Sequence, residues 1–189
     1  MPDAMEVEEQ EGEDHREISV AEFFEKNKHL LGFENPQKSI ITVVKEAVDN
    51  SLDACEQDDI IPEVQVLIDE VGDQKCRVEL RDNAIGMDAE TVPKVFGKLL
   101  YGSKFHKLQQ SRGQQGIGIS ASAMYAQLTT GEPVTVYSKE EGKPCNRFVV
   151  RMDTEANEPE IIEQEEVDPE GDEFPGDQDY YFDHGTSIE

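Results

Sequence analysis

Residues 45–54 read Lys45-Glu46-Ala47-Val48-Asp49-Asn50-Ser51-Leu52-Asp53-Ala54, and the fold can be interpreted outward from this segment. Wound as a helix at about 100° per residue, it places Glu46, Asn50 and Asp53 on one narrow face. Most polar helix faces are only solvated, and this helix alone would support that interpretation. Two glycine-containing loops further along favour a site, because each opens where a phosphate or a base could sit. The opposite face is apolar and should pack on a sheet; it holds Ile40, Ile41, Val44, Ala47, Val48, Leu52 and Cys55.

The composition indicates one folded and very acidic domain. The 189 residues include 17 Lys and Arg against 43 Asp and Glu, a formal net charge of −26. Hydrophobic residues make up 36% of the chain and lie in periodic runs, which argues against a disordered acidic protein. At about 1 M salt the Debye length falls to about 3 Å, so crowded carboxylates repel one another little. We therefore expect a halophilic protein from a high-salt cytoplasm.

The same composition excludes several kinds of site. Lys and Arg form no cluster that could grip DNA in a basic groove, so other domains or subunits would have to hold any DNA. Cys55, Cys76 and Cys145 lack Cys-x-x-Cys spacing, which favours buried free thiols in a reducing compartment over a metal site. The sequence has no apolar run long enough to span a bilayer and begins with acidic residues rather than a signal. We expect a cytoplasmic protein that does not contact a membrane.

Capping and periodicity divide the chain into elements. Residues 1–16 are expected to be an acidic disordered arm, and residues 17–189 the folded domain. Helices are predicted after a Ser19 cap, from the Asn35-Pro36 pair to about Gln57, from Asp88 to about Gly97, and over 119–128. Strands are predicted over 63–69, 76–82, 133–138, 147–152 and 160–163 and from 184, with 165–179 as a solvated acidic insertion. Because the last strand stops at Glu189, we expect the natural protein to continue.

Two loops and one acid stand out as candidate binding features. The period of two in Cys76, Val78 and Leu80 brings Asp82 to the inward face where the strand ends. The alternative is that Asp82 only caps the following turn, since Asp-Asn is a favoured turn pair. Residues 97–113 are poorly periodic and long for a connection, which is typical of a lid. Residues 113–118 place glycines before a helix, where bare N–H groups can approach an anion, although the spacing is not that of a Walker A loop.

Together these features resemble the GHKL ATPases, the family of gyrase, Hsp90, histidine kinases and MutL. Residues 46–54 resemble the family's N-box, residues 82–87 its Asp-x-Gly-x-Gly box, residues 113–118 its second glycine box, and Gly185-Thr186 its late Gly-Thr motif. Ala84 departs from the usual Gly, which requires a negative φ there. Gln114-Gln115 replaces a more hydrophobic pair. The resemblance implies a two-layer α+β sandwich of the Bergerat type, with a mixed, mostly antiparallel sheet and helices on one face.

Within that family the chain most resembles the B subunits of DNA topoisomerase VI, an archaeal type IIB enzyme. The residues that carry this closer resemblance are Ala21-Glu22-Phe23-Phe24, Gly32-Phe33-Glu34-Asn35-Pro36, Asp49 to Ala54, Tyr101-Gly102-Ser103-Lys104-Phe105, Ser111-Arg112-Gly113 and His184-Gly185-Thr186-Ser187. The resemblance implies that the chain ends before a transducer domain whose lysine would contact the γ-phosphate. A fragment without that lysine should bind ATP but hydrolyse it weakly.

The resemblance also implies a role for each site residue, with ATP and Mg²⁺ as cofactors. Glu46 would be the general base for the attacking water, and Asn50 would ligate Mg²⁺. Asp82 would accept a hydrogen bond from the adenine amine, supported by Thr186, while Gly86 lets the base lie close. The phosphate-binding lid and cradle would comprise Ser103, Lys104, Gly113, Gln114, Gln115, Gly116, Ile117, Gly118, Ile119 and Ser120.

The partners implied are a second B subunit, which dimerises with the first when ATP binds, and the DNA-cutting A subunit. These would form a heterotetramer of two A and two B subunits that passes one DNA duplex through a break in another. The chain offers no cleavage residue, since Tyr101, Tyr125, Tyr137, Tyr180 and Tyr181 are interpreted as structural.

Several alternatives stay open. One is a MutL-, Hsp90- or gyrase-like ATPase, which the lid disfavours. A histidine kinase is disfavoured by the hydrolytic base Glu46. The others are a nucleotide-gated dimerisation clamp with little turnover and an acidic interaction protein that binds no nucleotide.

Overall fold

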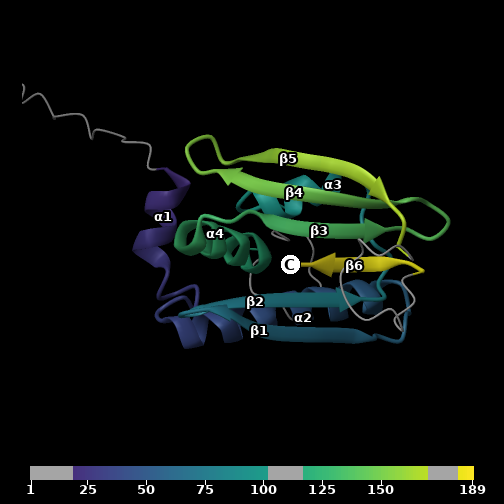
Figure 1. Cartoon of the computed structure of the whole chain (residues 1–189), viewed down its shortest axis with the longest axis horizontal. Helices are drawn as coiled ribbons and strands as arrows, with labels where there is room; N and C mark the ends of the chain where they lie inside the picture. The colour runs from purple at the N-terminus through teal and green to yellow at the C-terminus, as the bar shows by residue number, and fades with distance from the viewer. Residues whose placement is uncertain (1–18, 102–116, 170–182) are drawn as a thin grey trace, which may run out of the picture.

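The structure, a computed structural model, describes residues 19–101, 117–169 and 183–189. Within these ranges the chain forms an antiparallel sheet with helices packed on one face (Figure 1). The predicted α+β sandwich is therefore confirmed, with a sheet more uniformly antiparallel than the expected mixture. The expected disorder of residues 1–16 lies outside the described residues. No helix in the described ranges is both long and apolar enough to cross a membrane.

The sheet has six strands in the order β1-β2-β6-β3-β4-β5. The short final strand β6 lies in the middle, because Asp82 of β2 pairs with Thr186 on one side and Ser138 of β3 pairs with Thr186 on the other. Late chain residues are thus brought beside the end of β2. The strands are β1 (Val64–Gly72), β2 (Lys75–Asp82), β3 (Val134–Lys139), β4 (Cys145–Asp153), β5 (Glu158–Val167) and β6 (Gly185–Ile188).

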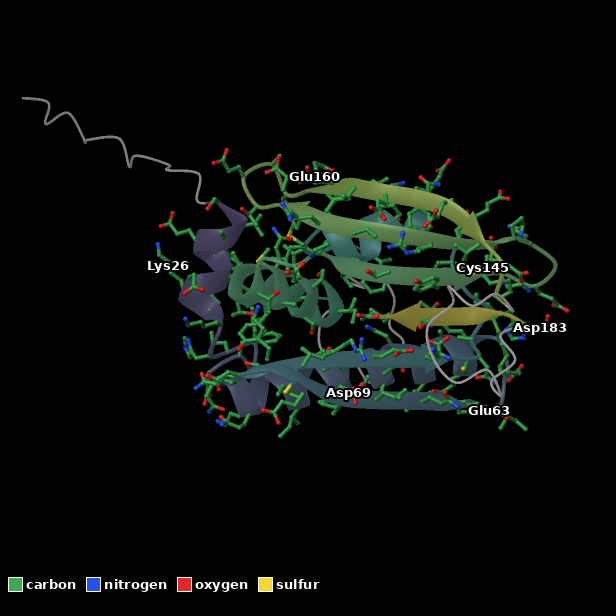
Figure 2. The ribbon with its side chains drawn as sticks, viewed as in Figure 1. Lys26, Glu63, Asp69, Cys145, Glu160 and Asp183 are labelled. Atoms are coloured by element: carbon green, nitrogen blue, oxygen red, sulfur yellow. The ribbon has the colours of Figure 1, made fainter. Side chains whose placement is uncertain are left out.

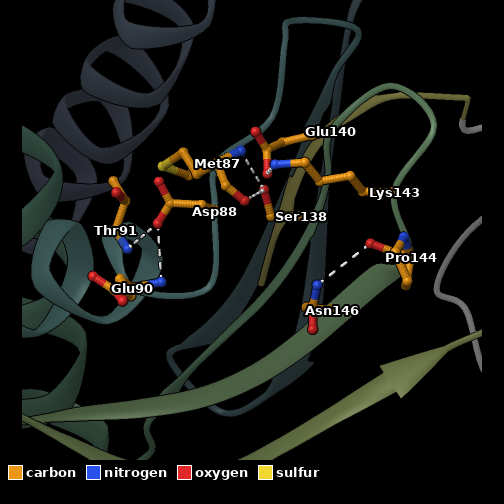
Figure 3. A network of polar contacts seen from close by, with 9 residues as sticks. All are labelled: Met87, Asp88, Glu90, Thr91, Ser138, Glu140, Lys143, Pro144 and Asn146. Carbon is orange, nitrogen blue, oxygen red and sulfur yellow. Dashed lines mark hydrogen bonds and ion pairs between the residues drawn. The ribbon is translucent and has the colours of Figure 1, made fainter.

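Local capping chemistry sets where the helices start. Asn35 Oδ1 accepts the N–H of Lys38 at 3.0 Å, and Pro36 opens the central helix as predicted. Asp88 Oδ1 accepts the N–H groups of Glu90 and Thr91 at 2.9 and 2.8 Å, so it caps α3 from just before its first turn (Figure 3). The helices are α1 (Val20–Asn27), α2 (Pro36–Gln57), α3 (Thr91–Gly97) and α4 (Gly118–Thr130).

The core lies between the helices and the inner face of the sheet. One cluster joins α1 to α4 around Phe24, Phe33 and Met124, and another joins α3 to β3 and β4 around Phe96 and Phe148. These clusters hold the helices rigidly against the sheet, so the ends of the helices and strands can position a site.

The predicted apolar stripe of α2 was partly wrong. Ile41 is 67% exposed, whereas Ser51 and Asp53 are buried with Ala47 and Cys55. Ser51 and Asp53 turn inward because they line a cavity beside α2, whereas Ile41 does not line it.

Other departures reflect pairing between distant segments. β5 reaches Val167 and takes up residues expected in the solvated insertion, because it pairs with β4 as far as Cys145 opposite Val167. Arg147 of β4 also binds Glu163 and Glu165 of β5 at 2.7 Å each. Cys76, expected to be buried, is exposed because both faces of the β1–β2 hairpin are open at that end. Asp69, Glu160 and Asp183, which Figure 2 labels, are exposed, as expected for so acidic a chain.

Candidate functional site

A cavity of about 260 Å³ lies between α2 and the sheet, closed by α3 and the start of α4. Its wall contains both predicted functional carboxylates, Glu46 and Asp82, and the amide of Asn50. The helix and the strand end that were matched to separate motifs therefore face one shared space. The other predicted site residues in this wall are Gly86, Gly118, Ile119 and Thr186.

Asp82 is fixed at one end of the cavity by three donors. Ser51 Oγ donates to Oδ2 at 2.7 Å, and the N–H groups of Ala84 and Thr186 donate to Oδ1 at 3.0 Å each. The side chain is buried, and burial raises the pKa of Asp82, while these hydrogen bonds and nearby His184 oppose the rise. The bond from Ala84 means that Asp82 caps the following turn and also lines the cavity, while its binding role stays a prediction.

Glu46 lies beside the first residue of α4. A Cβ added to Gly118 would fall 1.7 Å from Glu46 Oε2, so only glycine fits at this position without displacing the carboxylate. Lys45 Nζ lies 3.5 Å from Glu46 Oε1 and makes a shorter bond of 2.8 Å to Asp49. The end of the predicted glycine box is therefore in contact with the predicted base.

Asn50 follows Glu46 by one helical turn and belongs to the same wall. The described residues contain no cluster of three or more His, Cys, Asp or Glu that could hold a metal ion by itself. An amide oxygen beside a carboxylate suits Mg²⁺, which prefers oxygen ligands and keeps several waters. Such an ion would have to take its remaining ligands from water and from the oxygens of a bound phosphate.

The loop between Asp82 and Met87 has backbone φ angles that suit its alanine and its glycine. Ala84 is not among the residues with positive φ, which explains why alanine can replace the usual glycine. Gly86 has a φ of +73°, and a Cβ there would lie 2.2 Å from the Lys139 carbonyl oxygen. Gly185 has a φ of +136° and packs against the Asp82 carbonyl in the same way. Glycine is therefore needed at both of these positions.

Some predicted site residues are not tested by this geometry. Ser103, Lys104, Gly113, Gln114, Gln115 and Gly116 lie outside the described residues. The side chain of Ile117 packs in the core, and Ser120 Oγ donates to the Ile117 carbonyl at 3.0 Å. Both side chains already make contacts within the protein. Only the backbone N–H groups of Ile117 and Ser120 would therefore be available to bind a phosphate.

Sequence reasoning missed several residues of the wall. Tyr101, interpreted as structural, lines the cavity together with Met87, Val95 and Phe96. Ser51 was not singled out, although a small polar residue beside Asn50 on a helix that buries one flank was a usable signal. The apolar residues gave no such signal, because they resemble ordinary core positions.

Comparisons with known proteins identify relatives of this chain by sequence. The family of histidine kinase-, DNA gyrase B- and HSP90-like ATPases matches residues 38–186. The B subunit of type 2 DNA topoisomerase 6 from Archaeoglobus fulgidus is 55% identical over 93% of this chain and 27% of the relative. The proteins of that name from Methanosarcina barkeri and Halobacterium salinarum are 46% and 49% identical, over 97% and 92% of this chain and 28% and 21% of the relatives.

The chain thus spans about a quarter of the length of these relatives. The family match covers the central helix from Lys38 onward, both glycine-containing loops and the Gly185-Thr186 pair. By its sequence, the chain belongs to the family of histidine kinase-, DNA gyrase B- and HSP90-like ATPases.

Proposed function

We propose that the cavity binds Mg-ATP and that this chain is the ATP-binding and hydrolysing module of a type IIB DNA topoisomerase. The observation that carries the proposal is that Glu46, Asn50 and Asp82 line one cavity. The relatives named as B subunits of topoisomerase 6 support the assignment of the whole protein.

The Asp82 end of the cavity suits an adenine ring. Ala84, Met87 and Phe96 line this cavity with apolar surface, and a planar base can lie against such a wall. A buried carboxylate accepts a hydrogen bond from the exocyclic amine of adenine. A 6-oxo purine offers only an acceptor there, so the site should discriminate against guanine and hypoxanthine.

The Glu46 end suits the terminal phosphate. Glu46 would accept a proton from the attacking water, and Gly118 beside it starts α4, whose backbone N–H groups can face an anion. Asn50 would ligate Mg²⁺, and the bound ion supplies positive charge to the phosphate oxygens.

The negative charge on the described part of the cavity wall supports a metal cofactor. That part of the wall contains the carboxylates of Glu46, Asp53 and Asp82 but neither Lys nor Arg. A triphosphate in such surroundings needs positive charge from Mg²⁺ and from residues outside the described ranges, such as the predicted lid residue Lys104. A lysine from a following transducer domain would complete the site, so this chain alone should turn over slowly.

The wider assembly follows from the same proposal. ATP would drive dimerisation with a second B subunit, and the A subunit would cut the DNA, in a heterotetramer of two A and two B subunits. The net charge of −26 fits a module that leaves most DNA contacts to other parts of the assembly. The high proportion of acidic residues and the match to a Halobacterium relative support a halophilic archaeal protein of the cytoplasm.

The second candidate is a nucleotide-gated clamp with little turnover, favoured by the lack of cations in the described wall. Titration with Mg-ATP and a hydrolysis assay on Glu46→Gln, which keeps the size of the side chain, separate the two. The proposed function predicts saturable binding in both proteins, with turnover only in the unmodified one. If neither hydrolyses ATP, even within the full-length protein, the clamp is correct. Lack of saturable binding would overturn both.

A further inference from the structure

Residues 83–87 form a loop after β2 whose backbone shapes part of the cavity. Ala84, Gly86 and Met87 lie in the wall, and none of them has a polar side chain. The loop can therefore contact a base only through its backbone and its apolar surface, and both depend on where the loop lies. Residues outside the cavity must fix that position.

Ser138 on β3 holds the far end of the loop (Figure 3). Its Oγ accepts the N–H of Met87 at 2.7 Å and donates to the carbonyl of Met87 at 3.1 Å. The Ser138 side chain is 1% exposed and does not line the cavity. A hydroxyl that binds both backbone groups of one residue restrains the peptide planes on either side of it.

The next residue of β3 restrains the middle of the loop. The backbone of Lys139 lies so close to Gly86 that a Cβ there would clash with it. The loop is thus packed on β3 at Gly86 and hydrogen-bonded to β3 at Met87, which limits motion of this segment away from the sheet.

His184, just before β6, holds the near end of the loop. Its Nδ1 lies 2.7 Å from the Ala84 carbonyl oxygen. Because a carbonyl oxygen only accepts hydrogen bonds, Nδ1 must carry a proton for this bond to form. Two residues later, the N–H of Thr186 binds Asp82 Oδ1 at 3.0 Å. One short segment therefore holds both the loop and the carboxylate beside it.

We propose that Ser138 and His184 are positioning residues for base recognition, which set where the loop of residues 83–87 lies relative to Asp82. The inference rests on the proposed function, because it requires ATP in this cavity. Neither side chain contacts the nucleotide; both act through the loop backbone. Glu46 and Asn50 lie on α2, so the phosphate end should not depend on this restraint.

Competition binding with Mg-ATP and Mg-ITP tests the inference on Ser138→Ala and His184→Ala. ITP carries the same phosphates but has an oxo group in place of the adenine amine. Each variant should bind ATP about tenfold more weakly, because the loop is no longer held in its place beside Asp82 and the contact with the adenine amine is weakened. Affinity for ITP should change by less than about twofold, because ITP does not use the amine contact that the loop positions. The ratio of the ATP and ITP affinities should therefore fall.

Matched variants separate positioning from damage to the fold. Ser39 is also buried and donates to the Asn35 carbonyl at 2.8 Å, but it lies at the start of α2 outside the cavity wall. Ser39→Ala should leave the ratio unchanged. His184→Asn keeps a donor near the position of Nδ1 and should restore much of the ratio lost in His184→Ala, which decides the matter even if Ser138→Ala fails to fold.

Equal losses for ATP and ITP, or no loss for either, would overturn the positioning role. That result differs from failure of the proposed function, in which the unmodified protein would bind no ATP.

Discussion

The hydroxyl of Ser51 donates a hydrogen bond of 2.7 Å to Asp82 and so ties α2 to the end of β2. α2 also carries Glu46 and Asn50, which would serve the phosphate end of the nucleotide. A single helix therefore carries Glu46, the proposed general base, and supports Asp82, the proposed acceptor for the adenine amine. The spacing between the two ends of the cavity depends on this contact.

Replacement of Ser51 by alanine should weaken ATP binding and the fold together. The buried carboxylate would lose one of its three donors, which costs about 1–3 kcal/mol of unfolding free energy. ATP affinity should fall about tenfold, because only the two backbone donors to Oδ1 would still hold the Asp82 carboxylate. Urea unfolding and an ATP titration measure the two effects. ATP affinity equal to that of the unmodified protein would show that Ser51 does not hold the base-reading acid.

Replacement of Gly118 by alanine should impair turnover more than binding. The added methyl group would collide with Glu46 Oε2 and displace the carboxylate from the water that it would activate. The hydrolysis rate should fall at least about tenfold, with a smaller change in ATP affinity. Because turnover by the isolated chain is expected to be slow, the assay needs the full-length protein.

Gly72→Ala is the matched control for Gly118→Ala. Gly72 ends β1, and its nearest neighbour to an added Cβ is 4.0 Å away, which is ordinary contact. Unchanged turnover in Gly72→Ala together with a loss in Gly118→Ala would support the contact with Glu46. Normal turnover in Gly118→Ala would refute it.

The protonation of Asp82 should make ATP binding sensitive to acid. Burial raises the pKa of Asp82 above its ordinary value of 3.8, so the carboxylate becomes protonated at a higher pH in the fold than in the unfolded chain. As the pH falls through that raised pKa, the native state takes up the proton first, so this group alone would add stability. ATP affinity should fall over the same range, because the acceptor for the adenine amine is lost.

Asp82→Asn separates this effect from the titration of ATP itself, which both proteins share. The variant should bind ATP weakly at neutral pH, and its affinity should lack the acid-dependent loss that Asp82 causes. Identical pH profiles for the two proteins would exclude Asp82 as the titrating group.

The cysteines should differ sharply in their reactivity. Burial raises the pKa of Cys145 to about 11 and also raises that of Cys55, whereas Cys76 is exposed. At about pH 8, iodoacetamide should modify Cys76 alone in the folded protein and all of the cysteines after unfolding in urea. Mass spectrometry of the peptides gives the answer, and Cys76→Ser is the control that should remain unlabelled. Labelling of Cys145 as fast as that of Cys76 would contradict the buried environment.

The sequence could predict the features that depend on neighbouring residues alone, such as helix caps and strand periodicity. The Asn35-Pro36 pair located the start of α2, and the period of two along β2 placed Asp82 on its inward face. The order of the polar residues in residues 46–53 indicated the site, because helix geometry alone brings them to one flank.

Contacts between distant segments could not be predicted in this way. The burial of Ser51 and Asp53 depends on a cavity beside α2, and the full length of β5 depends on its pairing with β4. Ser138 and His184 lie 51 and 100 residues from the loop residues that they bind, so no local pattern signals these contacts.

The most direct measurement is the structure of the protein with Mg²⁺ and a non-hydrolysable ATP analogue. The account predicts the adenine amine within hydrogen-bonding distance of Asp82, and the terminal phosphate beside Glu46 with the metal ion at Asn50. A nucleotide bound elsewhere, or one with its phosphates at Asp82 and its base at Glu46, would contradict it.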